Sequence, residues 1–190
     1  MKDLLVILAK GFEEIEALTV VDYLRRAGAE VRIASAEGDL HVESSHGVVI
    51  RADAELRQLD PNEFRALYLP GGMPGAANLA GNAKVRAWVT QFNHEKKLIA
   101  AICAAPMVLD ALGILRENHY TCYPGFEERL KTKGRLDKIL VQDGHIWTAM
   151  GPALAQYLAL ELAAELKGMG AREKLRAELL YPELTEVICR

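Results

Sequence analysis

The chain has 190 residues, of which 51% are hydrophobic and 26% are charged, with 23 basic and 26 acidic side chains and a formal net charge of −3. This length and composition predict one well-packed domain that spans residues 1–190. Because there is no basic surplus, and because no apolar run reaches the roughly 18 residues of a membrane span, we expect neither nucleic acid nor a membrane to be a main partner.

Short β-rich runs alternate with helical patterns along the chain, which is typical of a parallel sheet covered by helices on both faces. The apolar run at residues 4–9 predicts a first strand over residues 3–9, and apolar residues at helical spacing predict a helix over residues 13–28. Residues 29–35 predict a second strand. The segments 40–44 and 48–53 flank Ser45-His46-Gly47 and predict a hairpin outside the parallel sheet.

The second half of the chain continues this alternation. The predicted strand at residues 66–70 runs into the loop Gly71-Gly72-Met73-Pro74-Gly75, and a helix is predicted at residues 83–95. The strand at residues 97–102 passes at Cys103 directly into a short helix. Later elements are predicted as strands at residues 119–124, 138–142 and 145–150 and as a long helix at residues 152–168. This order predicts a doubly wound α/β sandwich.

Cys103 is the first candidate functional residue, because ligands collect at the carboxyl ends of parallel strands. A residue between a strand end and a helix start lies in a tight, strained elbow that exposes its side chain. We expect the helix that begins at Ala104 to direct N–H groups at the sulfur, which would stabilise a thiolate and lower its pKa from about 8.5. The N–H groups of Gly71 and Gly72 approach without an obstructing Cβ, so with that of Ala104 they are candidates to bind an oxyanion.

Each of these features also has a structural interpretation. A cysteine at a strand end is often a small buried apolar group, and the glycine-rich loop is compatible with a simple turn. Glu13, Glu14 and Glu16 in the first turn of a helix are what the helix dipole alone favours. Glu16 lies on the inward side of that helix, next to Ile15 and Ala17, so it is the costliest of the three to bury without a purpose.

The motifs GFEEIEA near the N-terminus, LYLPGG, and AAICAAP around Cys103 resemble the DJ-one branch of the ThiJ/PfpI superfamily over nearly the whole chain. The resemblance implies a flavodoxin-like fold with a mostly parallel sheet, a homodimer, and no need for a metal or an organic cofactor. It implies that Cys103 is the reactive, easily oxidised cysteine of the family and that Glu16 is the acidic residue that hydrogen-bonds it. Gly72 and Ala104 match the family's backbone donors.

Two positions depart from the family pattern. Ala104 stands where the protease-like branch has histidine, which disfavours a cysteine–histidine peptidase. Tyr123 stands where the human member has a histidine in its site. His46 lies near the position at which that member has a basic residue. It is therefore a candidate to line the pocket or the dimer interface, although a histidine in a surface hairpin is usually only solvated. The resemblance implies that the dimer forms through the first helix and the hairpin.

Two functions from different classes follow from the resemblance and the residues. The first is a cysteine-dependent glyoxalase or deglycase that acts on α-oxoaldehydes or their early glycation adducts through a hemithioacetal on Cys103, with Glu16 moving a proton. The alternative is a non-enzymatic, peroxide-sensing chaperone that responds to oxidation of Cys103. A hydrolase of the amidotransferase kind is disfavoured, because no His-x-Glu pair follows late in the chain.

The chain contains Cys103, Cys122 and Cys189, which indicate free thiols in a reducing compartment and therefore a cytoplasmic protein. Cys122 is interpreted as a buried apolar group, with a resolving thiol as the alternative. Cys189 lies near the C-terminus and is expected to have no role. The spacing of the histidines matches no metal-ligand motif, so no metal site is predicted.

Overall fold

A mostly parallel sheet lies at the centre of the computed structural model, which describes the backbone of residues 1–188 and the side chains of residues 1–184. Its strands are β1 (Lys2–Leu8), β2 (Val31–Ser35), β5 (Ala54–Glu55), β6 (Phe64–Leu69), β7 (Leu98–Ile102), β8 (Leu140–Asp143) and β9 (Ile146–Ala149). They are ordered β5-β2-β1-β6-β7-β9-β8, with β8 antiparallel to β9 and the other neighbours parallel. A separate antiparallel hairpin is formed by β3 (His41–Glu43) and β4 (Val49–Arg51).

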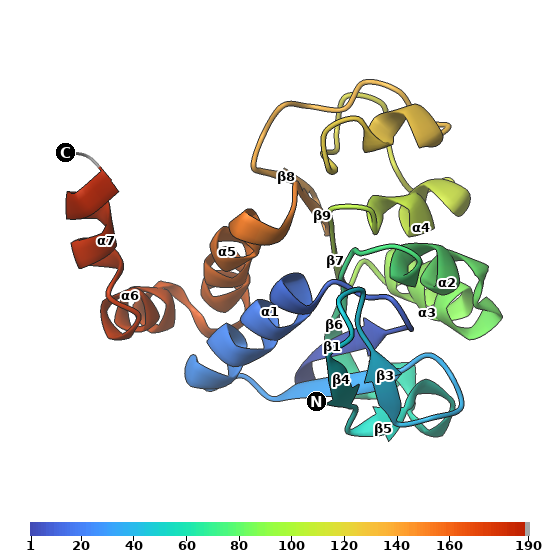
Figure 1. Ribbon diagram of the computed structural model, residues 1–190, viewed down its shortest axis with the longest axis horizontal. Coiled ribbons are helices and arrows are strands. Elements are labelled where there is room, and N and C mark those ends of the chain that lie inside the picture. Colours follow the sequence, from blue (N-terminus) through green and yellow to red (C-terminus); the bar gives the residue numbers. More distant parts are fainter. Residues whose placement is uncertain (189–190) are drawn as a thin grey trace.

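Helices cover both faces of the sheet (Figure 1). The helices are α1 (Glu14–Arg26), α2 (Gly75–Gly81), α3 (Ala83–His94), α4 (Pro106–Ala111), α5 (Ala155–Lys167), α6 (Met169–Glu178) and α7 (Tyr181–Ile188). Helices α1 and α5 pack together on one face, and α2, α3 and α4 lie on the other. Among the described residues, no helix combines the length and apolar character that a membrane crossing needs.

The first strand shows how the sequence pattern creates this two-sided core. Successive side chains of a strand point to opposite faces of the sheet. In β1, Leu4, Val6 and Leu8 pack in the cluster beneath α1 and α5, whereas Leu5 and Ile7 pack in the cluster beneath α3 and α4. A strand buried on both faces needs a continuous apolar run, and the run at residues 4–9 meets this need.

The predicted doubly wound α/β class is confirmed, and the elements lie close to their predicted ranges, with one exception. Residues 119–124 do not form a strand. Their backbone groups make isolated links instead: the Tyr123 N–H donates to the Cys103 carbonyl at 3.0 Å, and the Thr121 N–H donates to the Thr148 hydroxyl at 2.9 Å. The helices α2, α6 and α7 and the short strand β5 were not predicted, and Cys189 lies outside the described residues.

Candidate active site

The strained elbow predicted at Cys103 is confirmed. Cys103 follows β7 with a φ of +63°, a left-handed conformation that is unfavourable for a residue with a Cβ. Hydrogen bonds hold this conformation on both sides: the Cys103 N–H donates to the Ala149 carbonyl at 2.9 Å, and the Cys103 carbonyl accepts from the Tyr123 N–H at 3.0 Å. Cys103 remains partly exposed. The elbow therefore fixes the position of Cys103 while leaving the residue partly exposed.

Glu16 is completely buried and lies against Cys103. The N-cap of α1 is Glu13, whose carboxylate accepts the Glu16 N–H at 2.6 Å, so the cap fixes the backbone of the turn that carries Glu16. The Glu16 Oε2 accepts the Gly71 N–H at 2.7 Å, and the carboxyl lies close enough to the Cys103 thiol for each group to shift the pKa of the other. Its Oε1 is buried and has no hydrogen-bond partner among the described residues. The structure thus brings Glu16 and Cys103 together as expected.

The glycine-rich loop closes over this pair at very short range. A Cβ on Gly71 would lie 2.7 Å from the Cys103 Cβ and 2.8 Å from the Glu16 Oε2. Gly72 has a φ of +84°, and its N–H approaches the Cys103 sulfur, as does the N–H of Ala104. The close packing excludes any larger residue at position 71, so the loop is more than a simple turn. The short helix begins at Pro106 rather than at Ala104, but the Ala104 N–H still reaches the sulfur.

The electrostatics of the pair differ from the expectation for the thiol. Burial raises the pKa of Glu16 to about 8, although the N–H of Gly71 opposes the shift. Burial, followed by the negative charge of Glu16, also raises the pKa of Cys103 well above its ordinary value. The N–H groups of Gly72 and Ala104 lower that pKa without outweighing burial, so the predicted lowered pKa of the thiol is wrong. Because Glu16 ionises first, it is the group positioned to accept the proton of the thiol.

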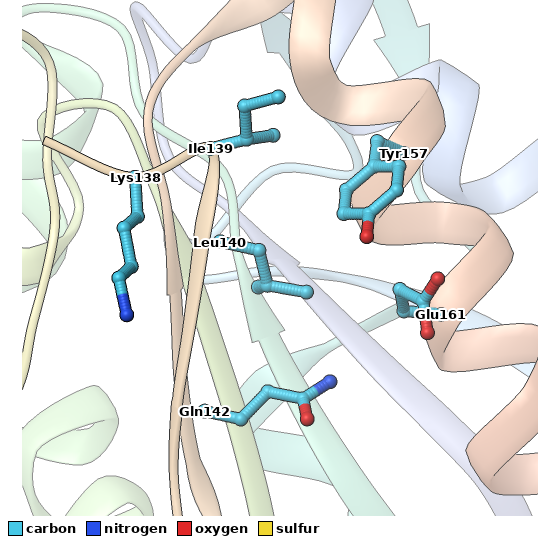
Figure 2. Close-up of a pocket in the computed structure, with 6 residues that line it drawn as sticks. All are labelled: Lys138, Ile139, Leu140, Gln142, Tyr157 and Glu161. Atoms are coloured by element: carbon cyan, nitrogen blue, oxygen red, sulfur yellow. The ribbon is translucent and has the colours of Figure 1, made fainter.

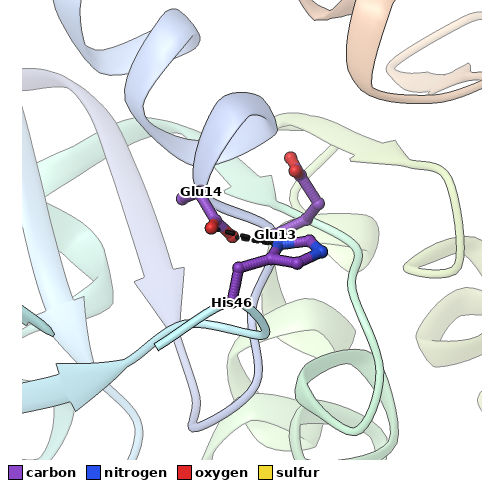
Figure 3. A group of neighbouring side chains, drawn as sticks. All are labelled: Glu13, Glu14 and His46. Carbon is purple, nitrogen blue, oxygen red and sulfur yellow. Dashed lines mark hydrogen bonds and ion pairs between the residues drawn. The ribbon is translucent and has the colours of Figure 1, made fainter. Parts of the chain in front are cut away.

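His46 lies near this turn but forms a different pair. Its Nδ1 is 3.0 Å from both carboxylate oxygens of Glu14, and its ring is exposed (Figure 3). The hairpin that carries His46 is linked to the segment before α1 by a bridge between Phe12 and Ser44. The described hydrogen bonds of the His46 side chain go to Glu14 and Ser45, and none reaches Cys103.

Glu13, Glu14 and His46 each offer one potential metal-ligand atom, and these atoms lie within 4.8 Å of one another. Glu13 already caps α1, and Glu14 already pairs with His46. These side chains therefore have structural partners, and we assign no metal to the group.

Cys122 and Tyr123 are consecutive residues beside the elbow, and they differ in exposure. Tyr123 contacts Cys103 through its backbone, and its half-exposed ring lies against Gly151. Cys122 is completely buried, 3.9 Å from the Glu127 carboxylate. The structure therefore favours the interpretation of Cys122 as a buried group.

The sequence reasoning missed Glu13 as the residue that fixes the turn. The spacing of Glu13 and Glu16, an N-cap acceptor followed three residues later by another acid, was an available signal for this role. The contacts of Cys103 with Ala149 and Tyr123 join segments that are distant in the sequence. No local pattern could have revealed them.

The fold and the site together define a flavodoxin-like α/β protein with a cysteine at a strand-to-helix elbow. Residues 2–165 match the model of the DJ-1/PfpI family, and the chain belongs to that family. The Protein dj-1beta of Drosophila melanogaster is 36% identical over 181 residues, covering 94% of this chain and 97% of that protein. The Deglycase PH1704 of Pyrococcus horikoshii is 33% identical over 152 residues, covering 78% of this chain and 90% of that protein.

Solved structures show the same likeness. The crystal structure of Drosophila melanogaster DJ-1beta matches with a TM-score of 0.90 and 36% identity, covering 94% of this chain and 97% of that chain. The structure of oxidized Toxoplasma gondii DJ-1 matches with a TM-score of 0.87 and 36% identity, covering 95% of this chain and 98% of that chain.

Proposed function

We propose that the protein is a cysteine-dependent glyoxalase or deglycase that acts on α-oxoaldehydes or on their early glycation adducts. The observation that carries the proposal is the buried Glu16 carboxyl held against the Cys103 thiol at a strained elbow. A nucleophile next to a proton carrier whose pKa is close to neutral is the arrangement that carbonyl chemistry requires. The similarity to a deglycase of Pyrococcus horikoshii supports the same class of reaction.

The first step joins the thiol to the aldehyde. When Glu16 is ionised, the Cys103 sulfur attacks the aldehyde carbon, a C–S bond forms, and the thiol proton passes to Glu16. The carbonyl electron pair becomes an oxyanion that accepts hydrogen bonds from the N–H groups of Gly72 and Ala104. Return of the proton from Glu16 to this oxygen gives a neutral hemithioacetal and regenerates the carboxylate.

The second stage moves a proton between two carbons. Glu16 removes the hydrogen from the former aldehyde carbon and returns it to the neighbouring carbon, while the hydroxyl proton moves to the neighbouring oxygen. The product is a thioester on Cys103, which water hydrolyses to a free thiol and a 2-hydroxy acid. Methylglyoxal plus water thereby gives lactate, and the sequence needs no oxidant or reductant.

The test is lactate release from methylglyoxal without added thiol. We expect Cys103→Ser to lower kcat by at least about 1,000-fold, since removal of a nucleophile typically costs this much. The variant Cys122→Ala is the matched control, because it removes the neighbouring buried thiol, and its rate should stay within about threefold of wild type. Equal rates for wild type and Cys103→Ser would end the proposal.

The second candidate is a peroxide-responsive chaperone. The N–H groups that reach the Cys103 sulfur would also stabilise a sulfinate, and a relative, Toxoplasma gondii DJ-1, has been solved in an oxidized form. The raised pKa of Cys103 weighs against this candidate, because the thiolate is the nucleophilic form that attacks peroxide. A mass gain of two oxygens at Cys103 with altered client binding, and no aldehyde turnover, would favour it.

We further propose a cytoplasmic homodimer that forms through α1 and the β3–β4 hairpin. Three large apolar side chains are exposed on this surface: Ile15 on α1, and Val48 and Val49 at the hairpin. Light scattering should show a dimer that Val49→Asp dissociates, whereas Ile139→Asp, at an exposed apolar residue elsewhere, leaves it intact. A monomeric wild type would contradict the proposed assembly.

A further inference from the structure

A pocket of about 380 Å³ lies beside the Cys103 elbow. It is lined by Tyr123, Pro124 and residues 150–154. Two backbone hydrogen bonds of the elbow explain its position. The Cys103 carbonyl accepts from the Tyr123 N–H at 3.0 Å, and the Cys103 N–H donates to the carbonyl of Ala149, the residue before the 150–154 segment. Both walls of the pocket are thus anchored to the peptide groups of Cys103.

The lining of this pocket is apolar. None of its side chains carries a charge, and the larger ones are those of Tyr123, Met150 and Leu154. Tyr123 is 51% exposed, and its ring lies against Gly151, where an added Cβ would be only 3.2 Å from the ring. A partly exposed aromatic ring over an uncharged wall favours contact with a flat apolar group.

We propose that this pocket holds the carbon substituent of an α-oxoaldehyde bonded to Cys103, and that the preferred substrates carry apolar substituents larger than methyl, aromatic ones included. This inference rests on the proposed function. A methyl group would leave most of the 380 Å³ to water, whereas a phenyl group can cover the Tyr123 ring and the side chain of Met150. The absence of a charged side chain among the lining residues disfavours substrates with phosphate or carboxylate substituents.

A second pocket, of about 430 Å³, provides a matched control (Figure 2). Figure 2 shows Leu140 and Gln142 of β8 pointing toward Tyr157 and Glu161 of α5. The described hydrogen bonds of Cys103 reach none of the residues that line it. A change at Tyr157 therefore perturbs a pocket of similar size without touching the elbow.

The experiment compares kcat/KM for phenylglyoxal, which gives mandelate, with kcat/KM for methylglyoxal, using initial rates. Ala153 lies in the pocket lining and is exposed, so Ala153→Trp fills the pocket from its rim. We expect this variant to lower the phenylglyoxal-to-methylglyoxal ratio by about tenfold. Loss of the contacts that a pocket makes with a few carbon atoms of a substrate has effects of this size. Comparing this ratio between variant and wild type cancels the difference in intrinsic reactivity between the two aldehydes.

Tyr123→Leu should lower the ratio as well, by removing the ring, and it supplies a second route if Ala153→Trp fails to fold. Tyr157→Ala should leave the ratio unchanged. An unchanged ratio in both pocket variants, with turnover intact, would overturn the pocket assignment while sparing the proposed function. If the wild type consumes neither aldehyde, the proposed function fails and this inference fails with it.

Discussion

Glu14 and Glu16 come from the same turn of α1 and form two side-chain pairs with opposite properties. Glu16 is completely buried against Cys103, and burial raises its pKa to about 8. Glu14 lies at the surface beside the exposed ring of His46; although partial burial opposes the change, the hydrogen bond from His46 lowers the pKa of Glu14. One turn of helix therefore holds a carboxyl that can remain protonated at neutral pH and another that is ionised.

The comparison shows that environment, rather than residue type, decides which carboxyl can take part in proton transfer. A group that exchanges protons during a reaction needs a pKa near the working pH. Glu16 meets this requirement because it is removed from water and has one backbone N–H donor and an unpartnered Oε1. The hydrogen bond with His46 favours the carboxylate form of Glu14, and this pair links the hairpin to α1.

Among the changes that test this contrast between Glu16 and Glu14, Gly71→Ala is expected to have the largest effect. The new Cβ would meet the Cys103 Cβ at 2.7 Å, the Glu16 Oε2 at 2.8 Å and the Ala104 N at 2.9 Å, so the pair must separate. We expect aldehyde turnover to fall by at least about 100-fold, the typical cost of misplacing reacting groups. Gly81→Ala is the control, since its Cβ meets nothing within 4 Å and its turnover should not change. Normal activity in Gly71→Ala would contradict the close packing.

A second prediction concerns stability and pH. The folded state holds the Glu16 proton up to a pKa of about 8, whereas the unfolded chain releases it near the ordinary value of 4.5, so stability should fall as pH rises between these values. Glu16→Gln removes this titration, and its Tm relative to wild type should therefore increase between pH 5 and about pH 8. A pH-independent difference in Tm would mean that Glu16 ionises normally in the folded protein.

The smallest effect on stability and activity is expected at the exposed pair of Glu14 and His46. The hydrogen bond and charge of Glu14 raise the pKa of His46, so the pair stabilises the fold at low pH and loses this contribution as pH rises through the folded pKa of His46. His46→Gln should lower Tm slightly at pH 6 and not at pH 9, and should leave aldehyde turnover within about twofold of wild type. A large loss of turnover would place His46 in the reaction.

The fold class was predictable because its signals are local. The apolar run of β1 and the passage of β7 into a helix at Cys103 are visible in neighbouring residues, and so is the elbow that results. Residues 119–124 read as a strand because of their aromatic and β-branched side chains, yet the Tyr123 N–H is bonded to Cys103 rather than to a neighbouring strand. Tertiary contacts overrode local propensity there.

The candidate site was predictable in its members and not in its electrostatics. Cys103 and Glu16 could be selected from motif and position, but the direction of the thiol pKa depends on how deeply both groups are buried and on their mutual contact. The pairing of His46 with Glu14 spans 32 residues and has no local signature.

The most direct test of the account is the rate of lactate formation from methylglyoxal by Glu16→Gln and by Glu14→Gln, measured side by side. Each change replaces a carboxyl of the same helical turn with an amide of nearly the same shape. The account predicts a loss of about 100-fold or more for Glu16→Gln, as is typical when a general acid–base group is removed, and less than about twofold for Glu14→Gln. Similar rates in the two variants would contradict it.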